Sequence, residues 1–247
     1  MNEFYVGYAP KMPIGLRVFV RRVVVTLGLL AIAVAVVLLS GQMPFAKSTF
    51  EFGQGRSFEG ILETTPYPSL LVDRPGAVES NSKYSRYLLV APGKHGADKL
   101  FEGMNSKRVR LKGQLIYRAG QSMIEVEASS VQTFANADPG PVQFHNLGEV
   151  SVTGEIVDSK CYLGVMNPGM GKVHRDCASR CISGGIPPMF VTSSGDQFLL
   201  VGPDEQPFQR DVLRKFIAEP IRLQGKLLER GDSRFLKIDL AELHHSN

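Results

Sequence analysis

The chain has 247 residues, of which 43% are apolar and 21% are charged, with 25 glycines and 15 prolines. This composition excludes collagen-like, coiled-coil and wholly disordered proteins, and three cysteines are too few for a disulfide-built scaffold. Most of the formal charge of +4 lies within residues 1–40, and the remainder is nearly neutral. A nearly neutral body offers no electrostatic surface for nucleic acid, so we expect no nucleic-acid partner.

An apolar stretch near the N-terminus predicts a membrane anchor over residues 23–40. No charged side chain occurs between Arg22 and Lys47. At about 1.5 Å per residue, a helix of this length just crosses a hydrocarbon core of about 30 Å. A cleavable signal peptide is the alternative, although its apolar region is usually shorter. The pair Arg21-Arg22 also leaves open a twin-arginine export signal.

Basic residues before this stretch predict its orientation. Because Lys and Arg favour the cytoplasmic side, residues 1–22 should form a cytoplasmic N-terminal segment. Residues 41–54 then form a stalk, and the body lies in a periplasm-like or other extracytoplasmic space. We therefore expect a single-pass protein of the cell (inner) membrane.

The body contains an internal duplication. Four segments recur in the same order: 58–62, 87–93, 109–115 and 123–127 correspond to 152–156, 198–204, 221–227 and 235–239. The last two pairs share one offset, so the copies keep their register. Each segment alternates apolar and polar residues, which is typical of half-buried strands. One such match would be chance, but four in order indicate a repeated domain.

These features predict a mainly β protein with short helices. In the second copy, the apolar spacing from Phe208 to Ile217 predicts a helix before the third repeated segment, and residues 97–102 form a shorter equivalent in the first copy. Strand order and glycine placement resemble the five-stranded barrel of the OB fold. The resemblance implies a fold and no activity, and two unrelated small sandwiches are the alternative.

The domain organisation follows from the repeat. We expect an OB-like domain at residues 55–135, a turn-rich linker at 136–147 and a second OB-like domain at 148–247. The copies differ most at an insertion, residues 158–190, in the second copy. A duplicated scaffold with one decorated copy is how functional sites are often added to folds.

The insertion holds every cysteine of the chain: Cys161, Cys177 and Cys181. A helix from Lys172 to Ile182 would place His174 on the same face as the last two cysteines, because positions i, i+3 and i+7 share one face. Cys161 would enter from the end of the preceding strand. Three thiols and an imidazole then form a Cys3His set of metal ligands.

Oxidation of these cysteines is the main alternative to metal binding. Exported cysteines usually oxidise, so Cys161 could form a disulfide with Cys177 or Cys181 and leave one thiol over. A bridge between Cys177 and Cys181 is disfavoured because their Cβ atoms would point in parallel from one helix. Thiol-based redox activity is a third possibility. The spacing matches no standard zinc, iron–sulfur or haem pattern.

If a metal binds, thiolate ligands in an exported protein favour copper(I) or zinc, with an iron–sulfur cluster less favoured. Met166 and Met170 are possible additional ligands, because thioethers suit copper(I). Packing within the loop is the simpler role for both methionines.

Three function classes remain open. We expect an accessory or docking subunit of a membrane complex, such as an electron-transfer complex, with other membrane-protein subunits as partners. A copper or zinc carrier or assembly factor is the first alternative, and a thiol–disulfide oxidoreductase is the second. The sequence contains no glycine-rich phosphate loop, nucleophile elbow or HExxH motif, which favours a non-enzymatic role.

Overall fold

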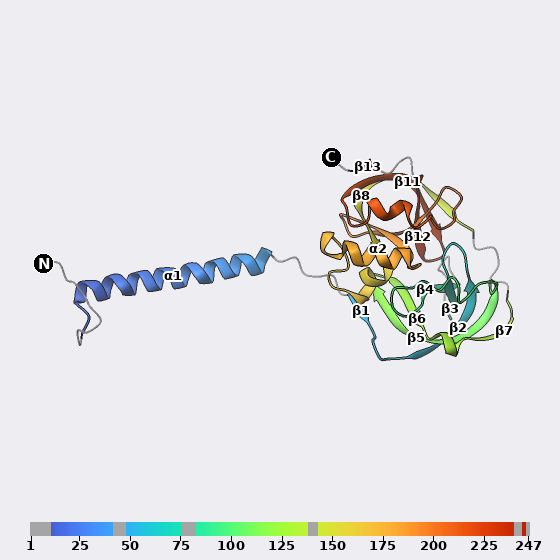
Figure 1. Ribbon diagram of the computed structural model, residues 1–247, viewed down its shortest axis with the longest axis horizontal. Helices are drawn as coiled ribbons and strands as arrows, with labels where there is room; N and C mark the ends of the chain where they lie inside the picture. The colour runs from blue at the N-terminus through green and yellow to red at the C-terminus, as the bar shows by residue number, and fades with distance from the viewer. Residues whose placement is uncertain (1–10, 42–47, 76–82, 138–142, 240–243, 246–247) are drawn as a thin grey trace. The chain divides into compact units, whose positions relative to one another are not determined.

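The computed structural model describes residues 11–41, 48–75, 83–137, 143–239 and 244–245. The chain divides into two compact units, Met1–Phe45 and Ala46–Asn247 (Figure 1). Both β-barrels belong to the second unit, so their mutual contacts are part of its structure.

Among its described residues, 11–41, the first unit contains the helix α1 (Ile14–Gly41). Residues Ile14–Ser40 are long and apolar enough to cross a membrane, and none of them is buried. This confirms an apolar helix that fits either a single span or a signal sequence. The helix begins earlier than the predicted 23–40 anchor, because Arg17 and Arg21 continue the same helical run. The predicted cytoplasmic segment 1–22 is therefore partly helical, and residues 1–10 lie outside the described residues.

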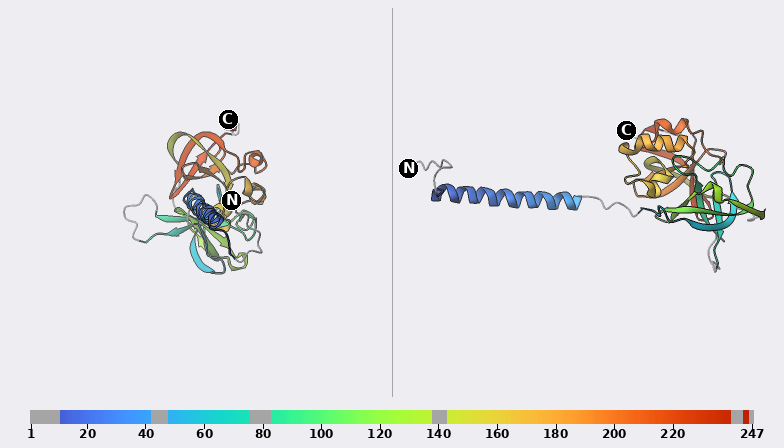
Figure 2. Two further views of the ribbon diagram at one scale, coloured as in Figure 1. Left: turned by 90° about the vertical axis from the view of Figure 1, so that its left-hand side faces the viewer. Right: turned by 60° about the horizontal axis from the view of Figure 1, so that its bottom comes forward.

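The first barrel is built from five strands: β2 (Arg56–Glu63), β3 (Ser69–Asp73), β4 (Tyr84–Val90), β5 (Lys107–Arg118) and β6 (Gln121–Val126). β5, β2, β3 and β4 are antiparallel neighbours, β4 pairs with β6 in parallel, and β6 closes the barrel on β5 (Figure 2). Three short elements extend it: β1 (Ser48–Phe50), η1 (Ala128–Ser130) and β7 (Gln132–Asn136). β1 pairs with β5, so part of the predicted stalk 41–54 lies in this sheet.

The second barrel repeats this topology. Its strands are β8 (His145–Asp158), β9 (Pro188–Thr192), β10 (Gln197–Val201), β11 (Ile221–Arg230) and β12 (Ser233–Lys237). β10 and β12 again form the parallel pair, β11 and β12 close the barrel, and β13 (His244–His245) pairs with β11. The predicted pair of five-stranded barrels after one long apolar helix is confirmed.

Repeated glycines explain part of the duplicated pattern. A Cβ atom at Gly60 would lie 2.4 Å from the carbonyl oxygen of Leu71, and one at Gly154 would lie 2.0 Å from that of Val191. Both glycines occupy equivalent positions where the first strand of each barrel passes close to its neighbour. A side chain there would force the strands apart, so the repeat preserves a packing requirement.

The predicted helix before the third repeated segment is shorter than expected. In the second barrel only the 3-10 helix η4 (Val212–Lys215) forms, and residues 97–102 of the first barrel make turns. Phe208, Leu213 and Ile217 are nevertheless buried. Their spacing reflects burial against the barrel, which a short irregular segment achieves without a full helix.

Three apolar clusters hold the body together. One lies in each barrel, around Phe101 in the first and Phe190 in the second. The third contains residues of both barrels, including Ile116 and Met123 from the first and Leu163 from the second. The barrels therefore share a core. The predicted boundaries at 55–135, 136–147 and 148–247 stay predictions.

Candidate functional site

The insertion joins β8 to β9 through residues 159–187, whereas residues 64–68 make the equivalent connection in the first barrel. It contains the π-helical turn η2 (Cys161–Val165), the 3-10 turn η3 (Lys172–His174) and the helix α2 (Arg175–Ser183). Gly184 caps the C-terminal end of α2, and its N–H donates to the carbonyl oxygen of Arg180. The helix predicted from Lys172 to Ile182 thus exists, with a 3-10 first turn.

The three cysteine sulfur atoms converge. Cys161, Cys177 and Cys181 have their Sγ atoms within 4.8 Å of one another, and all three are free thiols. Cys161 and Cys181 are buried, and Cys177 is partly exposed. The disulfide alternative has no support in this geometry.

His174 belongs to a second, overlapping group with Asp158 and Cys161. Its Nε2 lies 2.9 Å from Asp158 Oδ2, and the backbone N–H of Cys161 donates to Asp158 Oδ1 at 2.8 Å. All three residues are buried. The carboxylate therefore orients the imidazole next to the Cys161 sulfur, an arrangement common around metal-ligating histidines.

Asp158 was not anticipated from the sequence. It is the last residue of β8, three positions before Cys161, and an acidic residue at a strand end next to a cysteine was the available signal. The methionines are placed differently from each other: Met166 is exposed, and Met170 packs against the apolar cluster shared by the barrels. Their role as ligands stays a prediction.

Lys94 of the first barrel reaches the thiols, which the sequence also did not reveal. Its Nζ lies 2.7 Å from Cys177 Sγ and 3.8 Å from Cys181 Sγ. Nothing in the local sequence connects Lys94 with the insertion, because the contact depends on how the two barrels pack.

Close backbone packing holds the loop that carries Lys94. The Lys160 ammonium donates to the carbonyl oxygens of Ala91 and Gly93 at 2.9 and 2.7 Å. The N–H of Gly96 donates to Gly184, where a Cβ atom would lie 1.9 Å from the Lys94 carbonyl oxygen. The insertion and this loop thus form one packed unit across the two barrels.

Contacts within the cluster shift the pKa values of its thiols and of Lys94. The hydrogen bond to Cys177 raises the pKa of Lys94, which keeps the ammonium charged. The hydrogen bond from Cys161, together with the charge of Lys94, lowers the pKa of the Cys181 thiol. Cys161 shows the opposite effect, because donating to Cys181, burial and the Asp158 charge all raise its pKa. Thiolates are the species that bind metals, so the lowered pKa of Cys181 makes this residue the readiest ligand. A metal would displace the protons of the other thiols on binding.

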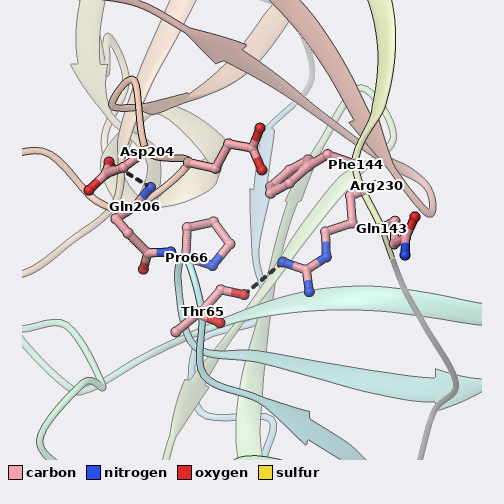
Figure 3. A pocket seen from close by; sticks show the side chains of 8 residues that line it. Thr65, Pro66, Gln143, Phe144, Asp204, Gln206 and Arg230 are labelled. Carbon is pink, nitrogen blue, oxygen red and sulfur yellow. Dashed lines mark hydrogen bonds between the residues drawn. The ribbon is translucent and has the colours of Figure 1, made fainter.

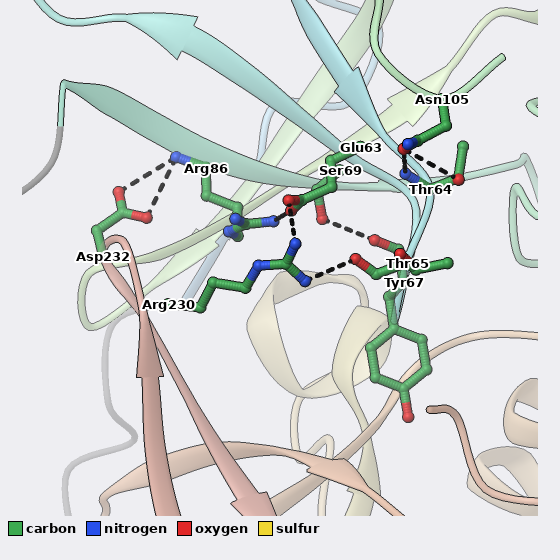
Figure 4. Close-up of polar contacts among 9 residues, drawn as sticks. All are labelled: Glu63, Thr64, Thr65, Tyr67, Ser69, Arg86, Asn105, Arg230 and Asp232. Carbon is green, nitrogen blue, oxygen red and sulfur yellow. Dashed lines mark hydrogen bonds and ion pairs between the residues drawn. The ribbon is translucent and has the colours of Figure 1, made fainter. Parts of the chain in front are cut away.

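A buried ion network reinforces the junction away from the thiols. Glu63 pairs with Arg86 and, at 2.6 Å, with Arg230 of the second barrel (Figure 4). The side chains of Glu63 and Arg86 are 8% and 2% exposed, so this charge pairing is shielded from water. Asp232 accepts the backbone N–H of Arg86 across the same junction.

A groove of about 470 Å³ opens beside this network (Figure 3). Its lining is Thr65, Pro66, Gln143, Phe144, Asp204, Glu205, Gln206 and Arg230. The Arg230 guanidinium stacks 5.0 Å from the Phe144 ring centre and donates to the Thr65 carbonyl oxygen. Glu205 pairs with Lys237 at 3.0 Å. These charged groups are satisfied within the protein, so the thiol cluster is the stronger candidate site.

Comparison with models of protein families, with curated proteins and with solved structures found no match for this chain.

Proposed function

We propose that the chain is a membrane-anchored, extracytoplasmic accessory subunit that binds a soft metal ion, copper(I) or zinc, at the junction of its two barrels. The observation that carries this proposal is the convergence of three cysteine sulfurs within 4.8 Å. A disulfide needs only two sulfurs, whereas a metal centre uses all three.

The dimensions of the cluster support metal binding. Thiolate sulfurs bind zinc at about 2.3 Å, so two of them on one ion lie about 4 Å apart. The observed cluster, with its sulfur atoms within 4.8 Å of one another, is compatible with this spacing. His174 is grouped with Cys161 and Asp158 but not with Cys177 and Cys181. We propose that it turns toward the thiols as a fourth, nitrogen ligand when the metal binds, with Asp158 orienting its ring. An iron–sulfur cluster is less favoured because such clusters usually take four cysteines.

The rest of the chain supports an anchored scaffold. The apolar helix α1, with basic residues near its N-terminal end, supports a location of the barrels on the extracytoplasmic side of a cell membrane. The two barrels, whose topology we take to be OB-like, share an apolar core and an ion network, so they present one rigid body. A single anchor and a rigid body suit docking on other membrane-protein subunits, such as those of an electron-transfer complex.

One observation favours a second function, thiol–disulfide exchange or metal transfer. Cys177 is partly exposed, unlike the two buried cysteines, and its sulfur contacts the Lys94 ammonium, so it is the thiol that an outside partner would meet first. In that case Cys177 would be the first thiol to react with a partner's sulfur or metal.

The test is metal analysis of the full chain, purified in detergent under anaerobic conditions, with thiols counted after denaturation. We expect about one equivalent of copper or zinc and three titratable thiols. Serine at Cys161, Cys177 or Cys181 should abolish the bound metal, and His174→Ala should weaken it. His145→Ala, in β8 outside the insertion, is the matched control.

Absence of metal together with a single titratable thiol would overturn the proposal in favour of a disulfide. Disulfide-exchange activity that is lost in Cys177→Ser and Cys181→Ser, but kept in His174→Ala, would identify thiol chemistry instead.

A further inference from the structure

The contact between Lys94 and Cys177 joins the two barrels at a place that solvent reaches. The Lys94 nitrogen lies 2.7 Å from the Cys177 sulfur. Lys94 is exposed and Cys177 is partly exposed. Both residues are therefore open to a dissolved oxidant.

The backbone on each side of this contact is fixed. Lys160 holds the carbonyl oxygens of Ala91 and Gly93, and Gly96 is bonded to Gly184 at the end of α2. The fold therefore holds the backbone of both residues in place, so the Lys94 ammonium stays within reach of the Cys177 sulfur.

The other sulfur atoms are poorer partners for an oxidised Cys177. Cys161 and Cys181 are only 4% and 1% exposed. Cys177 and Cys181 also lie one turn apart on α2, where their Cβ atoms point in parallel and a disulfide is strained. The lysine nitrogen is thus the accessible neighbour of the Cys177 sulfur.

We propose that Lys94 and Cys177 form a covalent N–O–S bridge when the reduced protein is exposed to dioxygen. One oxygen atom bonded to both would hold nitrogen and sulfur about 2.6 Å apart, close to the observed contact, and the product is a further reversible state of an oxidised thiol. Sulfur and nitrogen each lose two electrons, and dioxygen gains four. One of its oxygen atoms enters the bridge. The other leaves as water. The Lys94 ammonium and the Cys177 thiol carry four protons between them: water takes two, one is released to solvent and one stays on nitrogen.

The bridge has two consequences for the site. It ties the first barrel to the second by a covalent bond, and it removes Cys177 from the set of metal ligands. The proposal does not require metal binding, and it rests only on the proposed extracytoplasmic location for its supply of dioxygen. Oxidation would then switch the site from a metal-binding form to a closed form.

Peptide mass spectrometry of the full chain tests the bridge. Metal-free protein in detergent is exposed to air, denatured, alkylated and digested, with a dithiothreitol-treated sample in parallel. We expect the Lys94 and Cys177 peptides joined, about 14 Da heavier than their sum because one oxygen is gained and two hydrogens are lost. Dithiothreitol should release both peptides.

Lys94→Arg keeps the positive charge but should abolish the joined peptide and leave Cys177 open to alkylation. Lys99→Arg, an exposed lysine of the same segment, should retain it. Full alkylation of Cys177 in the air-exposed wild-type protein would overturn the proposal, as would a disulfide at Cys177 in its place. Metal content, measured on the reduced protein, decides the proposed function separately.

Discussion

The ammonium group of Lys160 in the second barrel lies 2.7 Å from the carbonyl oxygen of Gly93 in the first. Lys160 immediately precedes Cys161, and Gly93 immediately precedes Lys94. One buried side chain therefore fixes the spacing between the thiol cluster and the lysine that contacts it. The candidate site belongs to both barrels, although all its cysteines come from one.

Replacing Lys160 should destabilise the junction. The Lys160 side chain is 3% exposed and pairs with Glu125. Lys160→Met would leave that carboxylate and two carbonyl oxygens without their donor, a loss of about 3–5 kcal/mol in the free energy of unfolding. Urea unfolding of the reduced, metal-free protein measures it. Lys226→Met, which breaks an exposed pair with Glu149, should cost less than about 1 kcal/mol. Equal losses in the two variants would contradict a special role for Lys160.

Gly184 should tolerate no side chain. A Cβ atom there would lie 1.9 Å from the Lys94 carbonyl oxygen, so Gly184→Ala must push the Lys94 loop away from α2. We expect a loss of about 1–3 kcal/mol in stability and faster alkylation of Cys177 in the folded protein. Gly55→Ala, where the added Cβ meets nothing within 4 Å, is the control. An unchanged alkylation rate would show that the loop does not shield the cysteine.

The barrels could be predicted because their signals are local and repeated. Alternation along each strand and glycine at equivalent positions, such as Gly113 and Gly225, follow from close strand packing. The prediction of a full helix from Phe208 to Ile217 was wrong, although the apolar residues on which it was based are buried. Burial alone requires that apolar spacing, and it does not distinguish a full helix from the short η4.

The candidate site could be predicted only in part. His174 and Cys177 share one helical segment, so their spacing places them without knowledge of the rest of the fold. Lys94 and Asp158 approach the thiols through tertiary packing, with Lys94 coming from the other barrel. Charge pairs between distant segments leave no periodic pattern in a sequence, which is why both were missed.

Asp158 should affect metal affinity through His174. Asp158→Asn preserves the size of the side chain and an oxygen for the Cys161 N–H, but it removes the charge that orients the imidazole. We expect the affinity for zinc or copper(I) to fall about 10–100-fold in competition titrations with a chelator. Asp176→Asn, an exposed position on α2, should leave the affinity unchanged. A normal affinity in Asp158→Asn would show that His174 needs no such orientation or does not bind the metal.

Glu155 should make the stability of the body depend on pH. Burial raises its pKa above the ordinary value of 4.5, while the hydrogen bond from the Gly171 N–H and the His174 charge oppose the shift. Because the folded state holds this proton more tightly than the unfolded state, Glu155 costs stability as pH rises from about 4.5 through its folded pKa. Glu155→Gln keeps an oxygen for Gly171 and removes that loss. Relative to wild type, the variant should therefore gain more stability at pH 7 than at pH 4, as measured by urea unfolding. Glu149→Gln, at a largely exposed carboxylate, should show no such difference. A gain for Glu155→Gln that is equal at both pH values would show that burial of the charge has no effect on folding.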